Sequence, residues 1–206
     1  MDDVGMFPIG AVLLPTERMP LHIFEPRYRE LIGECIETEG EFGMLLEDEA
    51  GVRDLGTLAT VEEVVHRFEH GRLNIVVAGL RRFRVVSWTD RRSFRTAVVE
   101  AVVDEDEAPP DEAVAERALA LFRRLAEQAG SEVEPPEPDA ELLSYELASR
   151  VDFGTDVKQE LLGSLSERER LVRVVDLLGR AVDAIALERE VAERAGRNGK
   201  VFSPGN

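Results

Sequence analysis

Two histidines, His66 and His70, are the side chains whose spacing in this sequence could hold a metal ion. On a helix, a spacing of four places both imidazoles on one face, where they can bind zinc. The surrounding sequence instead predicts a strand that runs into a turn. Four residues of strand span roughly 13 Å, which is too far for one shared ion. We therefore predict no metal site here and no metal cofactor.

The motifs of nucleotide-driven and hydrolytic chemistry do not occur in the sequence. Gly-x-x-x-x-Gly-Lys-Ser/Thr, whose backbone cradles the phosphates of ATP, is absent, and so is the nucleophile motif Gly-x-Ser-x-Gly. The one cysteine, Cys35, falls on the apolar face of a predicted helix, where burial favours an unreactive thiol. We predict that the chain is not an enzyme and needs no cofactor.

A dense group of arginines could bind phosphate groups. The arginines and the aromatic residues interleaved with them are Arg81, Arg82, Phe83, Arg84, Trp88, Arg91, Arg92, Phe94 and Arg95. Basic and aromatic side chains on strands can bind RNA. However, the net charge of the chain is -17, which repels phosphate backbones and anionic membranes. An RNA-binding module that uses the strands from Arg81 to Arg95 is therefore the alternative function, and a solvated sheet face is the simpler interpretation.

A run of large apolar residues lies between Pro20 and Pro26. The alternation in Leu21-His22-Ile23-Phe24 predicts a strand with one buried face, and Pro26 suits the first turn of a following helix. The run has no catalytic partner, so it offers shape and apolar surface. An exposed strand edge beside it could add a strand of peptide. The predicted binding residues are Met19, Leu21, Ile23, Phe24, Arg81 and Arg82, some of which must instead belong to the core.

Strand patterns fill the first half of the chain and predict a small closed or half-closed β-barrel. One helix, beginning at Pro26, interrupts them. Gly79 is predicted to break one strand, and an irregularity is predicted near Glu63. The predicted extended segments are 6–14, 21–24, 42–46, 55–68, 73–78, 82–88 and 94–103.

The composition changes at Asp104, where an acidic segment with two prolines runs to Pro110. Beyond it the apolar residues recur with helical spacing. Asp111 and Asp139 are predicted to cap helices, and a short helix is expected after Gly154. The capping box that begins at Ser166 starts the longest predicted helix.

Several of these segments, taken in order, resemble a known family. They are Pro20 to Tyr28, Leu55 to Ala59, Val77 to Phe83, Lys158 to Leu162 and Ser166 to Leu178. Each motif is weak by itself, but their order over about residues 6–190 is similar to that in the N-terminal, substrate-binding domain of Lon proteases. The resemblance implies a PUA-like β-barrel followed by a helical bundle. It also implies a free-standing member of the family, without the ATPase module or the serine–lysine protease that follow in full-length Lon.

We therefore predict an α+β fold with a PUA-like β-barrel over residues 1–105, a helical bundle over 111–195 and a flexible tail over 196–206. The predicted function is non-catalytic binding of unfolded or extended polypeptide, as a substrate-recognition module or adaptor in protein quality control. A protease or chaperone is the expected partner, and nucleic acid and membranes are not. A cytoplasmic location is expected, because the sequence lacks a signal pattern and the roughly 20 consecutive apolar residues that span a bilayer.

Overall fold

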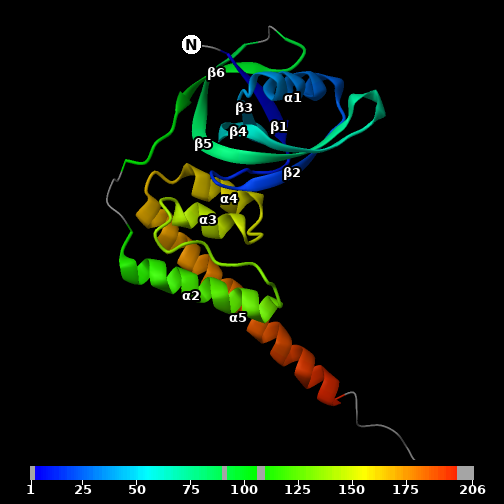
Figure 1. Cartoon of the computed structure of the whole chain (residues 1–206). Coiled ribbons are helices and arrows are strands. Elements are labelled where there is room, and N and C mark those ends of the chain that lie inside the picture. The colour runs from blue at the N-terminus through cyan, green and yellow to red at the C-terminus, as the bar shows by residue number, and fades with distance from the viewer. Residues whose placement is uncertain (1–2, 90–91, 106–109, 199–206) are drawn as a thin grey trace, which may run out of the picture.

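The computed structural model describes residues 3–89, 92–105 and 110–198 of the chain (Figure 1). Within them, a mixed sheet with α1 between its second and third strands precedes four further α-helices, so the predicted α+β class is confirmed. The strands are β1 (Val4–Ile9), β2 (Arg18–Ile23), β3 (Phe42–Asp48), β4 (Gly51–Arg67), β5 (Leu73–Thr89) and β6 (Thr96–Ala101). The helices are α1 (Pro26–Thr38), α2 (Glu112–Ala129), α3 (Leu143–Ser149), α4 (Thr155–Gly163) and α5 (Glu167–Asn198), and a short 3-10 turn, η1, covers Glu69–Gly71.

The six strands follow the order β2-β5-β4-β3-β1-β6, and β5 also pairs with β6. The pairings therefore lead from β1 through β3, β4, β5 and β6 back to β1. Strands β1 and β3 run parallel, and the other pairs are antiparallel. Strands β4 and β5 have 17 residues each, and their shared hairpin extends away from the rest of the sheet (Figure 1). Strand β2 pairs with β5 alone among the described strands.

The long hairpin bends at several shifts of register between β4 and β5. One shift lies between Val61 and Glu63, so the irregularity predicted near Glu63 is confirmed. The predicted break at Gly79 is wrong, because β5 runs through it without interruption. The glycine is needed for another reason: a Cβ at this position would lie 2.1 Å from the carbonyl oxygen of Leu14. Gly79 thus lets the segment before β2 cross β5 at close range.

Helix α1 begins where the sequence predicts it, with Pro26 in its first turn. Its buried residues recur with helical spacing and face the strands: Tyr28, Leu31, Ile32 and Cys35. The predicted burial of the thiol is confirmed, since Cys35 is 7% exposed. The apolar side of α1 therefore covers the core face of the sheet around Phe7 and Phe42.

The helical half follows some of the predicted caps and not others. Asp111 caps α2, where its carboxylate accepts the backbone N–H of Ala113 at 2.9 Å. The predicted cap at Asp139 is wrong, because the next helix begins at Leu143. In the first turn of α3, the backbone N–H of Ser144 instead donates to the carboxylate of Glu167 at 2.8 Å. This helix is capped by another helix, which no local sequence pattern reveals.

One apolar cluster is shared by the sheet and the later helices, and two further clusters belong to the strand half alone. Val12, Leu14, Leu46 and Leu55 of the strand half pack in the same cluster as the buried faces of all four later helices. The described strands end at Ala101 and α2 begins at Glu112, while the division into two subdomains stays a prediction. Part of the predicted boundary (106–109) and most of the predicted tail (199–206) lie outside the described residues, and α5 continues to Asn198. None of the helices that the structure describes is long and apolar enough to cross a bilayer.

Candidate functional site

Strand β2 divides the predicted binding residues between two faces. Side chains alternate along a strand, and here Leu21 and Ile23 point into the core, with 8% and 1% of their surface exposed. Met19, on the same face, is half-buried against that core. Phe24 directly follows the strand and is 60% exposed. Leu21 and Ile23 are therefore the members of the predicted set that belong to the core, and Phe24 is the large apolar side chain of this run that a partner can reach.

Phe24 belongs to a cluster of rings that spans β2 and the long hairpin. The His22 ring stacks on Phe24 at 5.9 Å between centroids and meets the edge of Phe68 at 5.8 Å. The His66 ring in turn lies 4.3 Å from Phe68. The register His22–Asn74–His66 across the three strands brings these rings together, and His22 Nδ1 lies 2.6 Å from Asn74 Oδ1. We call His22, Phe24, His66 and Phe68 the ring cluster.

The sequence did not indicate the contribution of Phe68, because it comes from a distant strand. In contrast, the alternation along β2 puts His22 and Phe24 on the same outer face, and this pairing can be predicted from the sequence. Val65, 56% exposed on β4, adds a further apolar side chain to the exposed part of the hairpin.

Pro20 lies in the middle of β2, opposite Val76 of β5. A proline has no N–H, so a strand accepts it where the missing donor would face away from its partner. The open side of β2 consequently lacks a donor at its centre, and such prolines protect edge strands from adding another strand. The arrangement favours contact through side chains of the outer face over a continuous ladder of backbone hydrogen bonds.

Most of the described arginines of residues 81–95 pair with carboxylates, whereas the exposed Arg95 lies over the ring of Trp88, 3.8 Å from its centroid. Arg81 gives two hydrogen bonds of 2.7 Å to Glu41, and Arg84 bonds Asp54 at 2.8 Å. Arg92 pairs with Glu34, and Arg91 lies outside the described residues. Carboxylates beside these guanidinium groups offset the attraction for phosphate.

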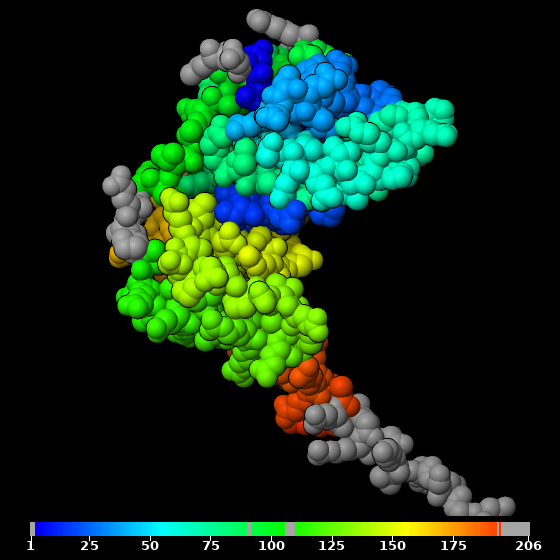
Figure 2. Space-filling view, viewed as in Figure 1, coloured from blue at the N-terminus to red at the C-terminus, as the bar shows by residue number. Residues whose placement is uncertain are grey.

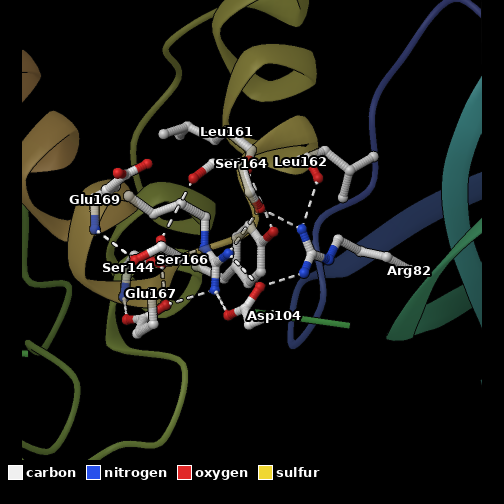
Figure 3. A network of polar contacts seen from close by, with 11 residues as sticks. Arg82, Asp104, Ser144, Leu161, Leu162, Ser164, Ser166, Glu167 and Glu169 are labelled. Carbon is white, nitrogen blue, oxygen red and sulfur yellow. Dashed lines mark hydrogen bonds and ion pairs between the residues drawn. The ribbon is translucent and has the colours of Figure 1, made fainter. Parts of the chain in front are cut away.

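Arg82, another residue predicted to bind a partner, is only 5% exposed and points into the interior. It enters a buried polar network between sheet and helices (Figure 3). Its guanidinium donates to the carbonyl oxygen of Leu162 at 3.0 Å and also bonds Ser164 and Asp104. Arg170, the other arginine of the network, donates to both carboxylate oxygens of Asp104 at 2.8 and 2.6 Å.

The network is completed by Glu167, which pairs with Arg170 at 2.9 Å and accepts the hydroxyl of Ser144 at 2.6 Å. It therefore joins strand β5, the segment after β6 and helices α3, α4 and α5. Every charged member has a partner of opposite sign, as buried charges require. The network links the strand half to the helical half, and two of its members, Asp104 and Glu167, also line a cavity beside α2.

Burial and pairing set the ionisation of these groups. Burial alone would raise the pKa of Asp104, but Arg170 and Arg82 outweigh it and hold the pKa below its usual value. Burial raises the pKa of Glu167 in spite of its hydrogen bonds from Ser144. Burial also raises the pKa of Tyr145, whose ring lies under Arg170, to about 12. Asp104 is therefore the carboxyl group of the network whose charged form the surrounding groups favour.

No group of three or more His, Cys, Asp or Glu side chains that could hold a metal ion occurs within the described parts of the chain. A cavity of about 1070 Å³ opens between α2 and the segment before α3. Apolar side chains such as Leu119 and Leu143 line it, together with several carboxylates, including Glu116, Asp139 and Glu141.

Comparison with known proteins identifies the family of this chain. Residues 3–180 match the family model of the ATP-dependent protease La (LON) substrate-binding domain. The Lon protease of Paraburkholderia phytofirmans is 27% identical over 202 residues, which is 90% of this chain and 25% of that protein. Lon protease 2 of Myxococcus xanthus is 27% identical over 198 residues, or 88% of this chain and 24% of that protein. The chain spans about a quarter of the length of these curated relatives.

Two solved structures are similar in fold. The Lon N-terminal domain protein from Xanthomonas campestris superposes with a TM-score of 0.68 at 24% identity, covering 85% of this chain and 98% of that one. The N-terminal domain of the Mycobacterium avium complex Lon protease also reaches a TM-score of 0.68, at 19% identity, with 86% and 98% covered.

Proposed function

This chain belongs to the family of Lon substrate-binding domains, and from that premise we propose that it is a non-catalytic module that binds unfolded or extended polypeptide. The observation that carries the proposal is the ring cluster, in which Phe24 is 60% exposed beside His22 and Phe68. Large exposed apolar side chains gathered at one place mark interaction sites on soluble domains. An unfolded chain offers the apolar side chains that such a surface can cover.

The scaffold of the proposal is a PUA-like β-barrel. Its support is the circuit of pairings that leads from β1 through β3, β4, β5 and β6 back to β1. A closed sheet has no free edge along that circuit, which leaves β2 and the projecting hairpin as the part of the strand half open to a partner. The buried network around Asp104 ties the helices to strand β5 of the sheet (Figure 3).

The mode of binding in this proposal is contact through side chains. Pro20 removes the central donor from the open side of β2, so an added peptide strand would lack one of its hydrogen bonds. Capture of side chains against aromatic rings tolerates many sequences, as recognition of unfolded clients requires. We extend the proposal to delivery of clients to a protease or chaperone as an adaptor. A cytoplasmic location belongs to it, since the lone, buried Cys35 fits a reducing compartment.

The test compares one client protein in two states. A fluorescently labelled protein that unfolds permanently when its disulfides are reduced and alkylated is titrated with this chain, and its native form is titrated in parallel. We expect saturable binding of the unfolded form and at least about tenfold weaker binding of the native form, because the folded client buries its apolar side chains. Equal binding of both forms, or no binding of either, would overturn the proposal.

A further inference from the structure

Acidic residues are concentrated on one part of the helical half. Residues 131–157 contain eight acidic side chains and one basic side chain, Arg150, which already pairs with Glu146 at 2.5 Å. The other seven are exposed, and no ion pair involves them within the part of the chain that the structure describes. They are Glu132, Glu134, Glu137, Asp139, Glu141, Asp152 and Asp156. We call these seven residues the acidic face.

Asp152 and Asp156 are the residues of the acidic face that come closest in the fold to the strand half. Asp156 lies in the first turn of α4, and Lys158 of the same helix pairs with Glu17 at 2.5 Å, immediately before β2 begins. In the space-filling view, the surface is hollowed between the projecting hairpin and the helices around residue 155 (Figure 2). The start of α4, which carries Asp156 and directly follows Asp152, and the projecting hairpin thus lie on opposite sides of one indented surface (Figure 2).

The cavity beside α2 continues the same pattern. Asp139 and Glu141 of the acidic face line it, and α2 adds the carboxylates of Glu112 and Glu116. Arg123 is the one basic side chain among its lining residues. Apolar surface framed by negative charge therefore extends along the helical half.

Aromatic rings on this side also suit cations. The guanidinium of Arg72 already lies over the ring of Phe68, 5.5 Å from its centroid. The face of an aromatic ring attracts Arg and Lys side chains, and a net charge of -17 raises the local concentration of cationic segments. A client segment that carries both apolar and basic residues would match rings and carboxylates together.

We propose that the clients bound at this surface are extended polypeptide segments of net positive charge, whose Lys and Arg side chains face the acidic face while their apolar side chains contact the ring cluster. This inference rests on the proposed function and adds the charge of the substrate class to it. Negatively charged segments of equal hydrophobicity are disfavoured by the same carboxylates.

The experiment uses two labelled unstructured peptides of one length that share the same apolar residues and differ only in having Lys or Glu at four positions. In low salt we expect the Lys peptide to bind about tenfold more tightly than the Glu peptide. The difference should shrink towards unity at 1 M salt, where the Debye length falls to about 3 Å. The variant D152N/D156N should weaken binding of the Lys peptide by a few fold and leave the Glu peptide unchanged or slightly tighter.

The matched control is E37Q/E188Q, which removes two exposed carboxylates from α1 and the far part of α5. It should alter the ratio of the two affinities much less than D152N/D156N does. Equal binding of both peptides, or tighter binding of the Glu peptide, overturns the inference and leaves the proposed function standing. Failure of both peptides to bind overturns both. If D152N/D156N does not fold, the salt dependence of the unaltered chain still decides.

Discussion

Arg170 of α5 forms a bidentate pair with Asp104, with hydrogen bonds from Nη1 to Oδ1 at 2.8 Å and from Nη2 to Oδ2 at 2.6 Å. Arg82 of β5 bonds the same carboxylate from the other side. One aspartate, placed just after the last strand, thus pairs with two buried arginines, and Glu167 supplies the second negative charge through its ion pair with Arg170.

The first prediction is that D104N strongly destabilises the chain. The amide keeps the shape of Asp104 but leaves Arg170, whose side chain is 0% exposed, without its main counter-charge. Breaking a buried ion pair from one side costs about 3–5 kcal/mol of unfolding free energy. Urea denaturation followed by circular dichroism measures it. The control is D54N, which removes an exposed partner of Arg84 and should cost less than about 1 kcal/mol.

The second prediction concerns acid. The pKa of Asp104 is lower in the folded chain than its unfolded value of about 3.9, because Arg170 and Arg82 outweigh the effect of burial. The stability that its charge contributes is therefore complete above that value and is lost as the pH falls through the folded pKa. Glu167 acts in the opposite sense, since burial raises its pKa and the folded state takes up its proton first.

The measurement for this prediction is the unfolding free energy of the unaltered chain and of D104N from pH 7 down to about pH 3. Subtracting the two curves reduces the contribution of Glu167 and leaves that of Asp104. We expect the difference in unfolding free energy between the unaltered chain and D104N to be constant above about pH 5 and to decrease below about pH 4. A difference in unfolding free energy that stays the same over the whole pH range would show that the charge of Asp104 does not stabilise the network.

The third prediction is that Cys35 is inert in the folded chain. Burial raises the pKa of its thiol to about 11. At pH 8 its thiolate fraction is then about two orders of magnitude below that of an ordinary cysteine, and the side chain is also covered. Labelling with a thiol-specific dye should be slow in buffer and complete within minutes in 6 M urea, and fast labelling of the folded chain would contradict the burial of α1.

The fourth prediction concerns proteolysis. Residues 131–138 have no regular structure and expose Glu132, Glu134 and Glu137, whereas the strands from Gly51 to Ala101 are paired along their length. A glutamate-specific protease should therefore cut first in 131–138 or in the predicted boundary between Asp104 and Asp111. Mass spectrometry identifies the sites, and early cuts within the paired strands, at residues 51–67, 73–89 or 96–101, would contradict the sheet assignment.

Local patterns sufficed for much of this fold. Pro26 predicted the start of α1, Asp111 the cap of α2, and the uneven alternation near Glu63 a shift of register. These features depend on residues close in sequence. The predicted strand break at Gly79 was wrong because the role of this glycine depends on Leu14, which approaches the strand from elsewhere in the chain.

For the candidate site, local sequence patterns predict even less than they do for the fold. The alternation in Leu21-His22-Ile23-Phe24 indicates two faces, but only the packing of α1 decides that Ile23 is the buried side and Phe24 the exposed one. Phe68 joins the ring cluster through strand register, and Arg82 turns inward to reach Asp104. Contacts between distant segments decide each of these cases, and a pattern within one segment cannot reveal them.

The fifth prediction separates scaffold from surface on β2. Alanine at Ile23, which is 1% exposed, should cost about 2–5 kcal/mol of unfolding free energy, because it leaves a cavity in the core. Alanine at Phe24 should change stability by less than about 0.5 kcal/mol, since the ring is largely in solvent. Melting curves of the two variants check this, and equal losses would show that both residues are core.

The central claim is that the ring cluster binds unfolded polypeptide, and the affinity of F24A for a labelled unfolded client tests it most directly. The matched control is V172A, which trims a side chain that is 52% exposed on α5, away from β2. We expect F24A to bind at least about fivefold more weakly than the unaltered chain at an unchanged melting temperature, as for an interface anchor, and V172A to bind normally. Unaltered affinity of a folded F24A, or an equal loss in V172A, would contradict the claim.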